Sequence, residues 1–445
     1  MLKIFPQYFQ IILAKLAASS AVALACFPFV APAQTGAVSM NLAGSDPRDY
    51  SAPPPFIARL GEVPDWTILD AYQHTITREE FTYLLNHCYA RSKEEYKDLI
   101  TIQEDRVLIL KQSNHPEAGW YDLRFRQKGH LSAEPPRFWR RPVDLPDLEP
   151  NSTRPLDGVL IAIDPGHIGG KWVTWDDRHF RIGRDTIEVR EGEMTLTVAK
   201  ILERDLSLLG ARVLLTRNSN HPVTEERVET LQEEARHYLI QRKKVPSGSL
   251  ISSTAKAMFA ISSEIRERGN LVNESLQPDL ALCLHFNASP MSARYPSFKT
   301  PNHLHLLING CYSGGEIAED DTRMEMLLRI LQRVYYEEVE LADEISRPMQ
   351  KETRLPSFHY DGTNGMAINN NDLVWARNLL ANRVFMCPVV FFEPYCMNHR
   401  EVYDRVQMGE YDGLREINGA YRKNIYQEYA DGITAGLVRY FEKNR

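Results

Sequence analysis

Two hydrophobic patterns alternate along the C-terminal two thirds of the chain. Short continuous apolar runs are typical of strands buried on both faces of a sheet. They occur at residues 159–163, 212–216, 280–286, 304–309 and 389–392. Longer segments with apolar residues on one side predict helices. These span residues 193–209, 225–241, 253–268, 324–345 and 426–443. Strands that alternate with helices predict an α/β fold, with a mostly parallel sheet flanked by helices, phosphorylase/hydrolase-like in type.

The region before this pattern is organised differently. A helix is expected over residues 77–89, because Thr77 can cap it and Glu80 follows three positions later. A strand is expected over residues 106–110. We therefore predict a small α+β domain of unknown role over residues 56–141. Repeated prolines mark residues 142–157 as a linker to a catalytic domain at residues 158–445.

The N-terminal 33 residues have the plan of a secretory signal peptide. Lys3 and Lys15 are their only charges, an apolar run covers residues 16–30, and small residues at 31–33 form a cleavage signal. The apolar run is shorter than the ~20 residues of a spanning helix, which favours cleavage over an uncleaved anchor. Cys26 also lies in a sequence that resembles a lipoprotein box. Residues 34–55 are rich in Ala, Gly, Ser and Pro, which predicts a linker.

Composition and charge exclude some functions. Hydrophobic residues make up 43% and charged residues 25% of the chain, which is ordinary for a folded protein. The net charge is −7 and no basic stripe is present, so we expect no nucleic-acid partner. The six cysteines lack the paired spacing of a cysteine zinc site.

Polar residues end three of the apolar runs. Asp164-Pro165-Gly166-His167 follows the first run, His285-Phe286-Asn287-Ala288 ends the run at 280, and Glu393 follows the run at 389. In open α/β sheets, ligands bind beyond the carboxyl ends of strands. The two histidines and Glu393 are therefore expected to converge although they are far apart in sequence.

Two histidines and a carboxylate form a common catalytic zinc set. The carboxylate that completes it should lie near His167, where the candidates are Glu188, Glu191 and Glu193. Each residue alone also has a structural interpretation: a histidine can be hydrogen-bonded at a strand end, Asp164 can serve a turn, and a glutamate can face the positive end of a helix. The joint pattern favours a metal site.

The segment from about Gly158 to the C-terminus resembles the zinc-dependent N-acetylmuramoyl-L-alanine amidases. The resemblance rests on the Asp164–His167 strand end, Glu191 with Leu196 and Ala199 at fixed offsets, His285 with Asn287 and Ala288, the strand at 210–217, and Glu393. Departures are Ile168 in place of a glycine, a longer stretch containing Trp172, Trp175 and His179, and long regions at 218–278 and 355–373.

The resemblance implies that His167, Glu191 and His285 bind Zn²⁺, and that Glu393 is the catalytic carboxylate that assists attack by zinc-bound water. It selects Glu191 over its neighbours. Asp164 is a candidate partner of a ligating histidine, and Asn287 a candidate substrate contact or turn cap. The implied reaction cuts the amide bond between N-acetylmuramic acid and L-alanine in peptidoglycan, in the periplasm or cell envelope. An activator protein and the oligomeric state are left open.

Two other functions are compatible with these residues. One is a zinc carboxypeptidase that trims stem peptides, and the other is a non-catalytic peptidoglycan-binding or activator module. The helix expected near 322–345 also has two interpretations, because it could cover the site as a lid or pack on the sheet as an amphipathic helix.

Overall fold

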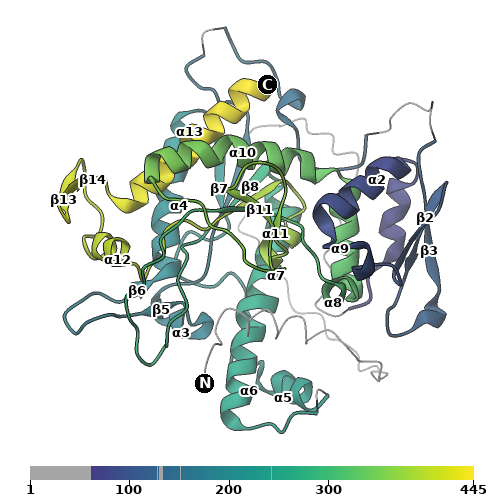
Figure 1. Cartoon of the computed structure of the whole chain (residues 1–445), viewed down its shortest axis with the longest axis horizontal. Helices are drawn as coiled ribbons and strands as arrows, with labels where there is room; N and C mark the ends of the chain where they lie inside the picture. The colour runs from purple at the N-terminus through teal and green to yellow at the C-terminus, as the bar shows by residue number, and fades with distance from the viewer. Residues whose placement is uncertain (1–61, 128, 130–133, 151, 242) are drawn as a thin grey trace, which may run out of the picture.

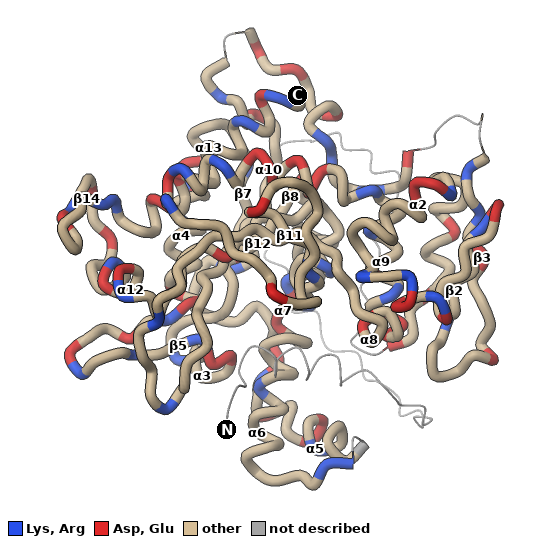
Figure 2. Tube along the Cα trace, viewed as in Figure 1, with Lys and Arg blue, Asp and Glu red and all other residues tan. Residues whose placement is uncertain are grey.

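The computed structural model describes residues 62–127, 129, 134–150, 152–241 and 243–445. The predicted signal peptide at residues 1–33, the linker at 34–55 and Cys26 lie outside these residues. Within the described ranges, no helix combines the length and the apolar character that a membrane crossing requires. Positive and negative residues are interspersed along the elements (Figure 2).

A seven-stranded sheet forms the centre of the molecule, with the order β10-β11-β9-β12-β8-β4-β7. Its strands are β4 (Leu160–Pro165), β7 (Arg212–Leu215), β8 (Leu280–Leu284), β9 (Leu306–Ile308), β10 (Met366–Ala367), β11 (Val374–Ala376) and β12 (Val389–Phe392). Only the β9–β12 and β10–β11 pairings are antiparallel, whereas the other four are parallel. The predicted α/β fold with a mostly parallel sheet is confirmed.

Strands β12, β8 and β4 are neighbours that run in the same direction, and this matters for the site. Phe392 pairs with Leu284, and Leu284 pairs with Pro165. The residues that follow these three strands therefore emerge side by side at one edge of the sheet. All residues of these strands are buried, and all but Asp164 are apolar, as expected for strands covered on both faces.

Helices α4 (Glu191–Leu208) and α10 (Val334–Thr353) pack against this sheet, and α13 (Ile425–Asn444) packs against both helices. Figure 1 shows α10 and α13 crossing in front of the strands. Glycines allow the close approach of these two helices, because a Cβ at Gly436 would overlap the Ile345 backbone and one at Gly432 would crowd Met349. The C-terminal helix predicted over 426–443 is confirmed.

The single helix predicted over 324–345 is wrong. The chain instead forms α9 (Asp320–Leu331) and α10, separated by Arg333 in a left-handed conformation with φ of 58°. Arg333 donates a hydrogen bond to the Thr75 carbonyl and pairs with Glu80, which places this corner against the N-terminal region. Because nearly all of α9 is buried, it is a packed helix and not a lid.

The region before residue 142 contains a separate antiparallel sheet, ordered β1-β2-β3. Its elements are α2 (Arg78–Leu84), β1 (Ile100–Ile102), β2 (Arg106–Leu110) and β3 (Trp120–Arg124). Thr77 caps α2 by accepting from the Glu80 N–H, as predicted. The hydrophobic core of this region is continuous with that of the large sheet. Buried Arg323 of α9 links them further, because it donates to the Leu110 carbonyl.

The long region at 218–278 is mostly helical. It comprises α5 (Gln232–Gln241), α6 (Gly248–Ala257) and α7 (Glu264–Asn270), where π-helical turns at 258–263 and 271–276 make one continuous run from α6 onward. Helix α5 begins later than predicted, and the second run is longer than the predicted 253–268. A second, small hydrophobic core lies between α5 and α6, and it includes Ile168. Figure 1 shows α5 and α6 projecting from the body.

Short elements complete the described chain. These are α3 (Val173–Asp176), β5 (His179–Phe180), β6 (Val189–Arg190), α8 (Gly314–Ile317), α11 (Leu380–Val384), α12 (Arg400–Gln407), β13 (Arg415–Ile417) and β14 (Ala420–Arg422). The two-stranded β5–β6 sheet leads directly into α4, so it sets the position where that helix begins.

Candidate metal centre

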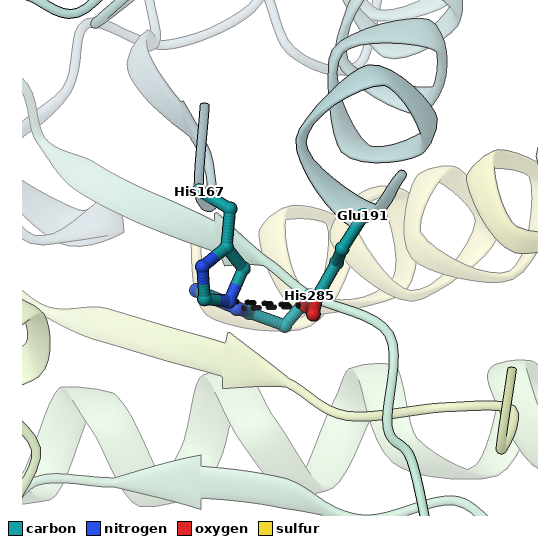
Figure 3. Close-up of side chains that lie close together, drawn as sticks. All are labelled: His167, Glu191 and His285. Atoms are coloured by element: carbon teal, nitrogen blue, oxygen red, sulfur yellow. Dashed lines mark hydrogen bonds and ion pairs between the residues drawn. The ribbon is translucent and has the colours of Figure 1, made fainter. Parts of the chain in front are cut away.

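Three side chains from separate parts of the chain meet at the edge of the sheet. His167 follows β4, His285 follows β8, and Glu191 is the first residue of α4. One nitrogen of each histidine and one Glu191 carboxylate oxygen lie within 4.8 Å of one another. In Figure 3 the three side chains point toward a common centre. The structure thus brings together the three residues predicted to bind metal.

The distances from the Glu191 oxygen to the two imidazole nitrogens match those in a tetrahedral zinc site. Glu191 Oε1 lies 3.3 Å from His167 Nε2 and 3.2 Å from His285 Nδ1. Zinc bonds of about 2.0–2.1 Å at tetrahedral angles require donor atoms to lie about 3.3–3.4 Å apart. Two imidazoles and one carboxylate are also a donor set that zinc prefers, and they leave a fourth position open. The residues present therefore fit the ion that the sequence predicts.

The same contacts control the protonation of the group. Burial disfavours a charged His167, but the Glu191 carboxylate and the Asp176 contact outweigh it and raise the pKa of His167 to about 9. Burial likewise disfavours a charged Glu191, but the facing histidines hold the pKa of Glu191 well below its usual range. Burial lowers the pKa of His285. The group therefore favours an ionised carboxylate facing a cation.

The His285 ring is held by packing against its neighbours. Its ring stacks on Phe391 at a centroid distance of 4.2 Å and meets the His167 ring edge-on. A Cβ at Gly166 would overlap the His285 ring, so a glycine is required there. The Phe286 N–H also donates to Glu191 Oε1 at 3.0 Å, which ties the two ligand-bearing segments together.

His167 has an unusual backbone. Its φ is 61°, in the left-handed region, which costs a non-glycine residue about 1–2 kcal/mol. The surrounding contacts hold it there, since Arg268 donates to the His167 carbonyl and the Asp176 carboxylate lies 3.3 Å from His167 Nδ1. Asp176 also accepts from the Ile168 N–H at 3.0 Å. A backbone outlier that is held this firmly at a polar cluster is typical of a functional site.

Asp176, and not Asp164, lies beside the ring of His167. Asp164 is buried and accepts from Thr216 Oγ1 at 2.5 Å and from Arg268 Nη1 at 3.0 Å. Asp176 is therefore a residue that the sequence reasoning missed. The only signal was the long stretch after His167, which was noted for its aromatic residues. Asn287 pairs with the segment after β12, because its N–H donates to the Pro394 carbonyl and its carbonyl accepts from the Met397 N–H. Its side-chain oxygen accepts from the Ala288 N–H.

The two glutamates that flank Glu191 in sequence have other partners. Glu193 Oε1 accepts from the Gly170 N–H and from Arg190, each at 3.0 Å. Glu188 pairs with Arg190 and His179. Among these three carboxylates, only Glu191 reaches both histidines, which is the choice that the family resemblance had favoured.

Glu393 emerges next to His285, because it directly follows the Phe392–Leu284 pair. Its N–H donates to the His305 carbonyl. No hydrogen bond to its half-buried carboxylate is found from any residue that the structure describes. Burial and the nearby Glu191 charge raise the pKa of Glu393 to about 7, although Arg178 and Arg377 act in the opposite direction. This is the protonation behaviour expected of a general base at neutral pH.

An aromatic wall that the sequence did not predict stands beside Glu393. His305 Nε2 lies 3.2 Å from the Tyr360 hydroxyl, which also accepts from Arg377 at 3.2 Å. The Phe358 ring lies between His303, His305 and Tyr360. Phe358 and Tyr360 belong to the long region at 355–373, so this departure from the family pattern contributes directly to the surroundings of the site.

Comparison with known proteins identifies one family. A family model described as N-acetylmuramoyl-L-alanine amidase matches residues 161–435. Among solved structures, the chain is similar to the N-acetylmuramyl-L-alanine amidase Ami1 from Mycobacterium smegmatis. The identity is 16% and the TM-score is 0.36, over 65% of this chain and 99% of Ami1.

Two further solved structures are similar. One is the CwlD amidase from Clostridioides difficile in complex with the GerS lipoprotein, at 12% identity and a TM-score of 0.36, over 64% of this chain and 100% of that one. The other is the catalytic domain of CwlV from Bacillus (Paenibacillus) polymyxa. The identity is 15% and the TM-score is 0.34, over 63% of this chain and 97% of that one. No curated protein sequence matches the chain.

Proposed function

This chain belongs to the N-acetylmuramoyl-L-alanine amidase family, and we propose that it hydrolyses the amide bond between N-acetylmuramic acid and L-alanine in peptidoglycan. The metal that it needs is zinc, held by His167, Glu191 and His285. The observation that carries this proposal is the 3.2–3.3 Å spacing of the two imidazole nitrogens from one Glu191 oxygen. Glu393 is the catalytic carboxylate.

The roles of the residues follow from their surroundings. A zinc ion in this set supplies a Lewis acid for the amide carbonyl and makes a water molecule more acidic. Glu393 takes the proton of the attacking water and passes it to the leaving nitrogen of L-alanine. Its carboxylate suits both transfers, because a pKa of about 7 lets it gain and lose a proton near neutral pH.

The site of action follows from the substrate. Peptidoglycan lies outside the inner membrane, and residues 1–33 have the pattern of a secretory signal peptide. We place the mature enzyme in the periplasm or cell envelope. A direct measurement is N-terminal sequencing of the protein recovered from the envelope fraction, which should begin at Gln34.

Digestion of purified peptidoglycan tests the reaction. The mature protein should release whole stem peptides with a free L-alanine amine, and chelation should stop the release until zinc is restored. A stem peptide shortened at its far end would instead identify a carboxypeptidase. A folded preparation that holds no zinc and releases nothing would identify a non-catalytic module. Either result would overturn the proposal.

A further inference from the structure

Helix α7 carries a buried arginine that donates hydrogen bonds to the segment bearing His167. The Arg268 side chain is only 2% exposed. Its Nη2 donates to the His167 carbonyl at 2.9 Å, and its Nη1 donates to the Pro165 carbonyl at 2.9 Å and to Asp164 at 3.0 Å. One guanidinium therefore holds the last two residues of β4 and the main chain of His167 that follows it.

Arg268 is itself held in place from behind. Glu264, one turn earlier in α7, accepts from Arg268 Nε at 2.9 Å and from Nη2 at 2.7 Å. The Glu264 carboxylate also accepts from the backbone N–H groups of Val223 and Thr224. The guanidinium is thus fixed in orientation by its own helix and by the loop after β7.

A second buried arginine completes the grip. Arg217 donates to the carbonyls of Pro165 and Gly166, and to that of Gly192 in α4. Two guanidiniums and the carboxylates of Asp164 and Glu264 make a charge-balanced cluster directly behind the loop. A balanced, hydrogen-bonded cluster of this kind persists in a buried site, where an unpaired charge would not.

The left-handed backbone conformation of His167 explains why these hydrogen bonds are needed. A residue with φ of 61° returns to an ordinary conformation unless its peptide groups are held. The bond from Arg268 to the His167 carbonyl fixes the peptide that follows the histidine. The Asp176 contact then fixes the ring itself. The direction of His167 Nε2 toward Glu191 depends on both.

We propose that Arg268 is a positioning residue for the metal centre: it holds the His167 main chain in the left-handed conformation that aims the imidazole at Glu191. The proposal rests on the proposed function only in taking zinc as the ion that these residues bind. It assigns part of the 218–278 region a role in metal affinity, since α7 belongs to it.

The variant Arg268→Lys tests this role. Lysine keeps the charge but lacks the planar fork that reaches two carbonyls and two carboxylates at once. Loss of a residue that orients a ligand typically weakens metal affinity about 10–100-fold. We expect a weakening in this range, measured by competition with a chelator of known affinity.

Helix α7 offers a matched control. Arg266 lies two residues away and is also buried, but it faces the other side of the helix and pairs with Asp321 and Glu325. Arg266→Lys disturbs a buried ion pair of the same kind without touching the His167 loop. A general loss of stability should therefore affect both variants, measured by thermal unfolding of the metal-free proteins. Weakened zinc binding should appear only in Arg268→Lys.

Two further measurements separate the possible outcomes. If Arg268→Lys does not fold, Glu264→Gln weakens the support of Arg268 and should lower zinc affinity in the same direction. The visible spectrum of the cobalt-substituted protein should change in Arg268→Lys and stay unchanged in Arg266→Lys. Equal zinc affinity in wild type, Arg268→Lys and Glu264→Gln would overturn the inference. Zinc binding that survives His167→Ala would instead overturn the metal site itself.

Discussion

The candidate site contains one glutamate on each of its two sides, and the two glutamates have opposite surroundings. On the side built by β4, β8 and α4, Glu191 faces two imidazoles, and its pKa lies well below the usual range. On the side built by β12 and β9, the half-buried Glu393 carboxylate accepts no hydrogen bond from the described residues, and its pKa rises to about 7. Surroundings that give two carboxylates very different pKa values suit them to different tasks. Glu191 is suited to hold a cation and Glu393 to move a proton.

The largest effect is expected on the Glu191 side. Glu191→Gln removes the charge that both histidines face, so zinc and turnover should be lost together. The loss of affinity should exceed the about 10–100-fold typical for an outer partner of a ligand. Elemental analysis and chelator competition measure it. The control is Glu193→Gln, because Glu193 opens the same helix but pairs with Gly170 and Arg190. Loss of zinc in Glu193→Gln and not in Glu191→Gln would exchange the two assignments.

The Glu393 side should respond in turnover alone. Glu393→Gln keeps the shape of the side chain but cannot accept a proton. General acid–base catalysis of this kind contributes about 100–10 000-fold, so kcat should fall by that factor. Zinc content should stay at the wild-type level, since the amide is not part of the three-residue group. A variant that loses its zinc, or one that retains full activity on purified peptidoglycan, would remove the contrast between the two sides.

A smaller loss of zinc affinity is expected at Asp176, which supports the Glu191 side of the site through His167. Its carboxylate orients the His167 ring, so Asp176→Asn should weaken zinc affinity by about 10–100-fold with the fold unchanged. Asp177→Asn is the matched control, because Asp177 is largely exposed and its carboxylate pairs with Lys256 at 3.7 Å. Affinities measured by chelator competition that fall equally in both variants would show that the loop, and not the carboxylate, matters.

The sequence predicted the positions of the two sides better than their supporting contacts. Buried strands are visible as continuous apolar runs, and β4, β8 and β12 run parallel, so polar residues directly after them had to meet at one edge. Short strands such as β10 and β11 have too few residues for a periodic pattern. No glycine or proline marks the break between α9 and α10 at Arg333. Contacts with Thr75 and Glu80, which are distant in sequence, hold this break, so the local sequence does not reveal it.

Supporting residues are hard to predict for a related physical reason. Asp176 and Arg268 reach the His167 loop from segments that follow it by nine and about a hundred residues, and nothing in their local sequence indicates the contact. Asp164 was the nearest carboxylate in sequence, yet it faces Thr216 and Arg268. The two histidines could be identified because they follow buried strands, and the family resemblance selected Glu191, whereas the partners of these ligands are set by the packing of the long loops.

The pH dependence of turnover gives the smallest expected change and bears most directly on the Glu393 side. A raised carboxylate pKa means that the base form appears only as pH rises toward about 7. Activity per bound zinc should therefore fall about tenfold for each pH unit below that pKa, as expected for one required base. A bound cation favours the ionised form of Glu393, so the midpoint of the pH profile should lie at or somewhat below 7.

Zinc content must be measured at each pH, because protonation of His167 also releases metal. The residual activity of Glu393→Gln should lack this rise. If that variant shows the same rise as wild type, the titrating group lies on the Glu191 side and the division of tasks fails.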